Sequence, residues 1–183
     1  MIVALLNLGY FFVEFVMARR LGSVSLFADS VDFLEDAAIN FMVFFALVWS
    51  ARTRARVGHV LAVIIVVPAV ATLWTAIVKI ANPTPPEVLP LTLTALGALA
   101  INLVCAGLLV RHRGAQNSLV RGAWLAARND SFANLLVLAA ALVTLGWYSG
   151  WPDIVAGLII GALNADAAVK VWKLASLERL AAR

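Results

Sequence analysis

"VLPLTLTALGALAINLVCAGLLV", residues 88 to 110, is a run of 23 residues without a charged side chain. An apolar helix of about 20 residues is long enough to cross a lipid bilayer. Two other uncharged runs have a similar length, 22 residues at 57–78 and 21 residues at 131–151. These three runs predict three membrane-spanning helices.

The composition of the whole chain agrees with this prediction. Of its 183 residues 63% are hydrophobic and 13% are charged, whereas soluble domains are roughly 45–50% apolar and 25% charged. Three further apolar segments contain acids or bases, and the polar stretches between segments, such as ARTRAR at 51–56, are interpreted as turns. We therefore predict an all-α polytopic membrane protein, a six-transmembrane-helix bundle of residues 1–175 with a short cytoplasmic tail at 176–183. The predicted spans are about 2–18, 24–49, 57–81, 88–111, 120–147 and 153–172.

Basic residues predict the orientation, because cytoplasmic loops carry an excess of Lys and Arg. With a cytoplasmic amino terminus, ten basic residues fall inside and three outside, and Arg128 lies within a span. Both termini should then face the cytoplasm, with lipids around the helices. The bases form no stripe, so they give no support for nucleic-acid binding. The inner set is Arg52, Arg54, Arg56, Arg111, Arg113, Arg121, Lys170, Lys173, Arg179 and Arg183, and the outer set is Arg19, Arg20 and Lys79.

The second segment concentrates acids in "SLFADSVDFLEDAAINFMVFF", residues 25–45. On a helix, Asp29, Asp32 and Asp36 share one face, whereas Glu35 points about 100° away from Asp36. Unpaired carboxylates in a bilayer would each cost on the order of several kcal/mol, so protons, a basic partner or a metal ion must neutralise them. Arg128 could pair with one acid but not with three. Because Asp32 and Asp36 are four residues apart, they suit two oxygen ligands of one cation.

The fifth segment, "AWLAARNDSFANLLVLAAALV" at 123–143, supplies oxygen donors from a second helix. Asp130 and Asn134 are four residues apart on one face, and Asn129 is turned by about 100° from Asp130. Asp36 and Asp130 both fall near the middle of their spans, which favours a shared site. An alternative for Asn134 is a hydrogen bond between helices. Glu14, in the first span, is a candidate for proton movement.

Three stretches together resemble the cation diffusion facilitators: "GSVSLFADSVDFLEDA" at 22–37, "RNDSFANLLVLAAALV" at 128–143 and "GWPDIVAGLIIGAL" at 150–163. The resemblance implies a proton-coupled exporter of divalent cations, working as a homodimer, and not an enzyme. It implies that Asp32 and Asp36 occupy the two metal-binding positions of the second helix and Asp130 the aspartate of the fifth. A bacterial inner (plasma) membrane is the expected location.

Two departures from the family pattern stand out. Ala126 occupies the position of the family's fifth-helix histidine, so Asn134, Asn129, Asp29 or water would complete the metal's ligands. Oxygen ligands favour a harder ion such as Mn²⁺, although zinc, usual in the family, also accepts carboxylates. The second departure is the end at Arg183: without the cytoplasmic metal-binding domain of many members, we expect the membrane helices alone to form the dimer.

Proton coupling follows from the crowded carboxylates, since protons and a divalent cation compete for the same oxygens. The sequence has no phosphate-binding G-x-x-x-x-G-K-S/T loop, and we expect no ATP or organic cofactor. Gly157 and Gly161 permit close helix approach, either within the chain or across a dimer. The alternatives are a non-transporting membrane partner or metal sensor with the transporter fold, an intramembrane aspartyl hydrolase, and an exporter of organic cations.

Overall fold

The helices of this protein were located in a computed structural model that describes residues 1–45, 49–110 and 118–181. Within these ranges the chain forms six α-helices and no strand. One helix overlaps each predicted span, although several helix ends differ from the predicted bounds. The helices are α1 (Ile2–Leu21), α2 (Val24–Phe45), α3 (Ala51–Ala81), α4 (Val88–Val110), α5 (Ser118–Gly146) and α6 (Trp151–Ala181).

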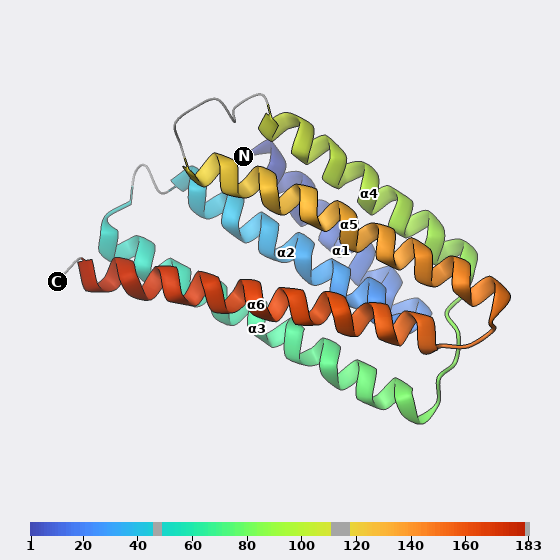
Figure 1. Ribbon diagram of the computed structural model, residues 1–183. Helices are drawn as coiled ribbons and strands as arrows, with labels where there is room; N and C mark the ends of the chain where they lie inside the picture. The colour runs from blue at the N-terminus through green and yellow to red at the C-terminus, as the bar shows by residue number, and fades with distance from the viewer. Residues whose placement is uncertain (46–48, 111–117, 182–183) are drawn as a thin grey trace.

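The helices run alternately up and down, so that both termini lie at the same end of the bundle (Figure 1). α2 is the central helix and packs against α1, α3, α5 and α6. α3 and α6 form a closely packed pair along one side of the group made by α1, α2, α4 and α5 (Figure 1). Residues on α2 therefore face several helices at once, and this position places its acids inside the bundle.

The turn predicted at 51–56 is wrong, because α3 already begins at Ala51. Ser50 caps this helix, and its Oγ accepts a hydrogen bond of 3.3 Å from the Thr53 N–H. Alanine and arginine are good helix formers, so a basic stretch after a capping serine continues a helix well. The charged residues at 51–56 extend the third helix beyond its apolar run.

Small residues bring α6 against the helices beside it. A Cβ atom on Gly157 would lie 2.6 Å from Val24 Cγ1 and 2.8 Å from the Ser25 nitrogen, at the start of α2. A Cβ atom on Gly161 would lie 3.3 Å from Thr72 Cγ2 on α3. Both glycines thus serve contacts within the chain, one of the two alternatives that the sequence leaves open.

Large apolar side chains cover much of the outside. On α3, Val60, Val63, Val67, Val70 and Trp74 are all more than half exposed, at intervals of three and four residues. A long apolar stripe of this kind is rare on soluble monomers and fits a lipid-facing surface. Of the described residues, two stretches are by themselves long and apolar enough to cross a membrane, Ile2–Leu21 and Val88–Leu109.

Candidate metal and ion site

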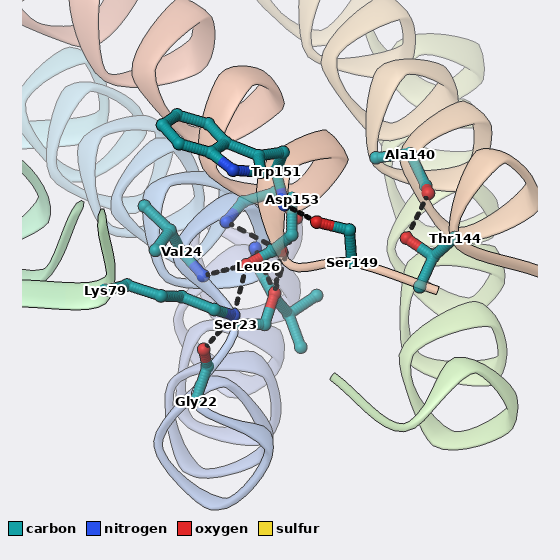
Figure 2. A network of polar contacts seen from close by, with 11 residues as sticks. Gly22, Ser23, Val24, Leu26, Lys79, Ala140, Thr144, Ser149, Trp151 and Asp153 are labelled. Carbon is teal, nitrogen blue, oxygen red and sulfur yellow. Dashed lines mark hydrogen bonds and ion pairs between the residues drawn. The ribbon is translucent and has the colours of Figure 1, made fainter. Parts of the chain in front are cut away.

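A buried carboxylate, that of Asp153, lies at one end of the bundle in the first turn of α6. Asp153 Oδ2 accepts a hydrogen bond of 2.8 Å from Lys79 Nζ at the end of α3 (Figure 2). The same carboxylate accepts hydrogen bonds from the Val24 N–H at 2.8 Å and from the Ser23 and Ser25 hydroxyls at 2.6 Å. A carboxylate at the amino end of α2 is favourable because the free N–H groups there carry partial positive charge.

Lys79 also fastens the turn between α1 and α2. Its Nζ donates a second hydrogen bond, 2.6 Å long, to the Gly22 carbonyl. Gly22 has φ 58°, a left-handed conformation that suits glycine at a helix end. Lys79, one of the three basic residues predicted on the outer side of the membrane, has a side chain that is 8% exposed, and Asp153 is fully buried. This group, which we call the Asp153 latch, consists of Gly22, Ser23, Val24, Ser25, Lys79 and Asp153.

Deeper in the bundle, Asp36 on α2 is buried beside polar groups from two other helices. Asn7 Nδ2 on α1 donates a hydrogen bond of 3.2 Å to Asp36 Oδ2. The carboxyl group of Asp130, on α5, lies within hydrogen-bonding range of the Asp36 carboxyl group. Cys105 Sγ on α4 is 3.5 Å from Asn7 Oδ1 and extends this contact to a fourth helix. We call these four residues the Asp36 cluster.

Asp29 belongs to a neighbouring group of buried polar side chains. Asn134 Nδ2 on α5 donates to Asp29 Oδ1 at 3.3 Å and to the Asp130 carbonyl at 2.7 Å. The carboxyl group of Glu14, on α1, lies within hydrogen-bonding range of Asp29. Glu14, Asp29 and Asn134 are each 0% exposed, and together we call them the Glu14 cluster. Asn134 thus joins the two clusters through its amide nitrogen.

The predicted site residues are therefore close together but not gathered around one point. Asp32 is partly buried on α2, between Asp29 and Asp36 in sequence. Among the residues whose side chains are described, no three His, Cys, Asp or Glu side chains converge so that they could hold one metal ion. The side chains of Ala126, Arg128 and Asn129 fall outside that described part. The effect of Ala126 on the metal's ligands, the pairing of Arg128 with an acid and the role of Asn129 as a ligand therefore stay predictions.

Sequence comparisons identify similar proteins. Residues 1–178 match the family described as the cation efflux transmembrane domain. The chain is 29% identical over 145 residues to the zinc transporter ZitB of Pectobacterium atrosepticum, an alignment that covers 73% of this chain and 45% of that protein. It is 26% identical over 184 residues to the cadmium, cobalt and zinc/H⁺-K⁺ antiporter of Bacillus subtilis, covering 90% and 57%. The chain spans about half the length of these curated relatives.

Proposed function

Since this chain belongs to the cation efflux family of membrane transporters, the cation diffusion facilitators, we propose that it is a proton-coupled antiporter that exports a divalent metal cation. The family consists of transporters rather than enzymes, which removes the basis for the aspartyl hydrolase alternative.

The observation that supports the metal site best is the approach of Asp36 and Asp130. These two acids come from α2 and α5, and their carboxyl groups lie within hydrogen-bonding range in the bundle interior. Two carboxylates this close repel each other strongly when both are ionised, and a bound divalent ion or a shared proton relieves the repulsion. We assign Asp32, Asp36 and Asp130 as the metal ligands, with Asn134 and, more weakly, Asp29 and Asn129 completing the set.

The transported ion is proposed from the ligand chemistry and from the relatives. Carboxylate and amide oxygens bind manganese well and also accept zinc. The printed names of the relatives give zinc for one protein and cadmium, cobalt and zinc for the other. Zinc is therefore the first ion to test, and manganese, which the sequence favours through Ala126, is the second.

Transport requires that the binding site open alternately to the two sides of the membrane. We propose six spans within one membrane domain, both termini in the cytoplasm and assembly as a homodimer. Metal entering from the cytoplasm displaces protons from the carboxyl groups, and rocking of the helices then exposes the site to the other side. Protons from that side return to the oxygens and release the ion. We propose that Glu14 takes part in this proton movement.

The proposal is tested by metal flux into proteoliposomes. A metal-sensitive dye and a pH dye inside the vesicles report zinc, cobalt or manganese entry and the accompanying proton movement. We expect Asp32→Asn, Asp36→Asn and Asp130→Asn each to abolish both signals. Glu87→Gln, at an exposed acid before α4, is the matched control and should transport normally.

The same preparation separates transport from the alternative role of a partner or sensor. A protein that binds zinc in a calorimetric titration but produces no metal flux in any gradient would support the sensor. Competition by a large organic cation, with no metal flux, would instead favour an organic-cation exporter. Metal flux that persists in Asp36→Asn and Asp130→Asn would overturn the assigned ligands.

A further inference from the structure

The Glu14 cluster contains buried oxygen atoms that nothing in the described structure satisfies. Both carboxyl oxygens of Glu14, Asp29 Oδ2 and Asn134 Oδ1 have no hydrogen-bond donor. These four atoms belong to side chains that are fully buried. A buried polar atom without a partner is strongly unfavourable, and native proteins rarely leave several of them together. A bound cation would satisfy several of these acceptors at once, whereas a proton shared between the two carboxyl groups would satisfy only part of them.

The three side chains come from three helices and face one another. Asn134 Nδ2 is 3.3 Å from Asp29 Oδ1, and the Glu14 carboxyl group lies within hydrogen-bonding range of Asp29. Two acceptors fix the orientation of the Asn134 amide, because its nitrogen donates to both Asp29 Oδ1 and the Asp130 carbonyl. The amide oxygen is then the atom left without a partner.

Other polar groups nearby are already engaged. The Tyr10 hydroxyl, one turn before Glu14 on α1, donates to the Thr94 carbonyl at 2.7 Å. Lys79, a buried basic residue of the described part of the chain, lies instead in the Asp153 latch, where it binds Asp153 and Gly22. Ionised carboxylates only accept hydrogen bonds, so Glu14 and Asp29 cannot satisfy each other as anions.

We propose that Glu14, Asp29 and the Asn134 side-chain oxygen bind a monovalent alkali cation, at a site separate from the Asp36 cluster. An oxygen-only set suits a hard cation. The energy needed to strip water from an ion rises with the square of its charge, so a monovalent ion enters a fully buried site at a lower dehydration cost than a divalent one. Mg²⁺ in particular keeps several of its waters, which this enclosed site does not favour.

The site is connected to the Asp36 cluster without being part of it. Asn134 donates to Asp29 in one cluster and to the Asp130 backbone in the other. A cation on Glu14 and Asp29 would repel a divalent ion beside Asp36 and Asp130, and it would also occupy Asp29 and Asn134, the weaker members of the divalent ligand set, so the two ions should compete for binding. The proposed binding of an alkali ion does not depend on whether the chain transports metal.

The test is binding of radioactive sodium and of rubidium, a potassium substitute, to the purified full chain in detergent with a chelator of divalent ions. Excess unlabelled sodium or potassium should displace the label in a saturable manner, whereas N-methylglucamine should not. Glu14→Gln and Asp29→Asn should weaken binding by roughly 10–100-fold or more, since each removes a charged ligand. Glu87→Gln is the matched control and should bind like the natural protein.

Two further measurements keep the outcome decisive. Thermal unfolding followed by the six tryptophans, at constant ionic strength, should give a higher midpoint in the favoured alkali salt than in N-methylglucamine chloride, and Glu14→Gln should lose this difference. Asp36→Asn should lose metal flux but keep alkali binding, because Asp36 is a ligand of the proposed divalent ion and not of the alkali ion. Absence of saturable binding to the natural protein, or unchanged binding in Glu14→Gln, would overturn the proposal. Loss of binding in Asp36→Asn would overturn the separation of the sites.

Discussion

Asn7 on α1 donates a hydrogen bond of 3.2 Å to the carboxylate of Asp36 on α2. The bond orients one of the proposed metal ligands, because Asn7 is itself fully buried and its amide oxygen is 3.5 Å from Cys105 Sγ. Asn7 would thus act as a supporting residue of the proposed metal site, one contact away from the ion. Such partners hold a ligand in the orientation that binding requires.

Replacing this support should weaken metal binding. We expect Asn7→Ala to lower divalent-ion affinity by roughly 10–100-fold, as the loss of supporting partners does at other metal sites. The measurement is the metal concentration that gives half-maximal flux in proteoliposomes. Asn164→Ala is the matched control, since Asn164 is a buried asparagine whose amide donates to the Ala28 carbonyl and not to a carboxylate. Equal affinity losses in the two variants would argue against a specific role for Asn7.

The Asp153 latch predicts an asymmetry between its two charged members. Asp153→Asn leaves the Lys79 ammonium buried without its counter-charge, and breaking a buried ion pair in this way costs about 3–5 kcal/mol. Lys79→Met should cost less, because Asp153 keeps its bonds to Ser23, Val24 and Ser25. Thermal unfolding in detergent, followed by tryptophan fluorescence, compares the two variants directly. A larger loss of stability for Lys79→Met would contradict the arrangement of Figure 2.

The contact between α6 and α2 depends on the absence of a side chain at Gly157. An added Cβ would lie 2.7 Å from the Val24 carbonyl carbon, a backbone atom that cannot rotate away. We expect Gly157→Ala to destabilise the protein by about 1–3 kcal/mol, the usual effect of overpacking.

Gly107 on α4 provides the matched control for this substitution. Nothing lies within 4 Å of a Cβ built there, so Gly107→Ala should be neutral or raise stability by up to about 1 kcal/mol through helix propensity. The comparison uses the midpoint of thermal unfolding in detergent. If both substitutions raised that midpoint, α6 and α2 would not be in the close contact described.

The three long uncharged runs each predicted a helix, because about 20 consecutive apolar residues suit a helix that crosses a bilayer, whereas the other three helices contain acids or bases and were predicted from weaker apolar segments. The runs at 57–78 and 88–110 lie within α3 and α4. Helix ends were harder to predict, since charged residues outside the bilayer do not have to end a helix. For this reason α3 begins at Ala51 and α1 continues to Leu21, three residues beyond its predicted end.

The grouping of the acids was only partly predictable. Helical periodicity placed Asp29, Asp32 and Asp36 on one face, and the structure keeps Asp29 and Asp36 buried. Periodicity does not give the rotation of α1 against α2, which pairs Glu14 with Asp29 and Asn7 with Asp36. One helix face therefore supplies two neighbouring clusters rather than a single set of ligands.

The Asp153 latch was missed for a different reason. Lys79 and Asp153 are 74 residues apart, and each lies at the end of an apolar segment where a charge is ordinary. The available signal was that the predicted topology brings these two ends to the same side of the membrane with opposite charges. Recognising their burial also required the packing of α3 against α6, which no local pattern reports.

The metal preference should respond to position 126, one helical turn before Asp130. A histidine there would add an imidazole nitrogen four residues from an assigned ligand, on the same face of α5. Because imidazole favours zinc over manganese, we expect Ala126→His to raise the ratio of zinc flux to manganese flux. The measurement is the two fluxes in parallel proteoliposomes. Ala127→His, turned by about 100° from that face, is the matched control and should leave the ratio unchanged. An unchanged ratio in Ala126→His itself would mean that the carboxylates alone set the preference.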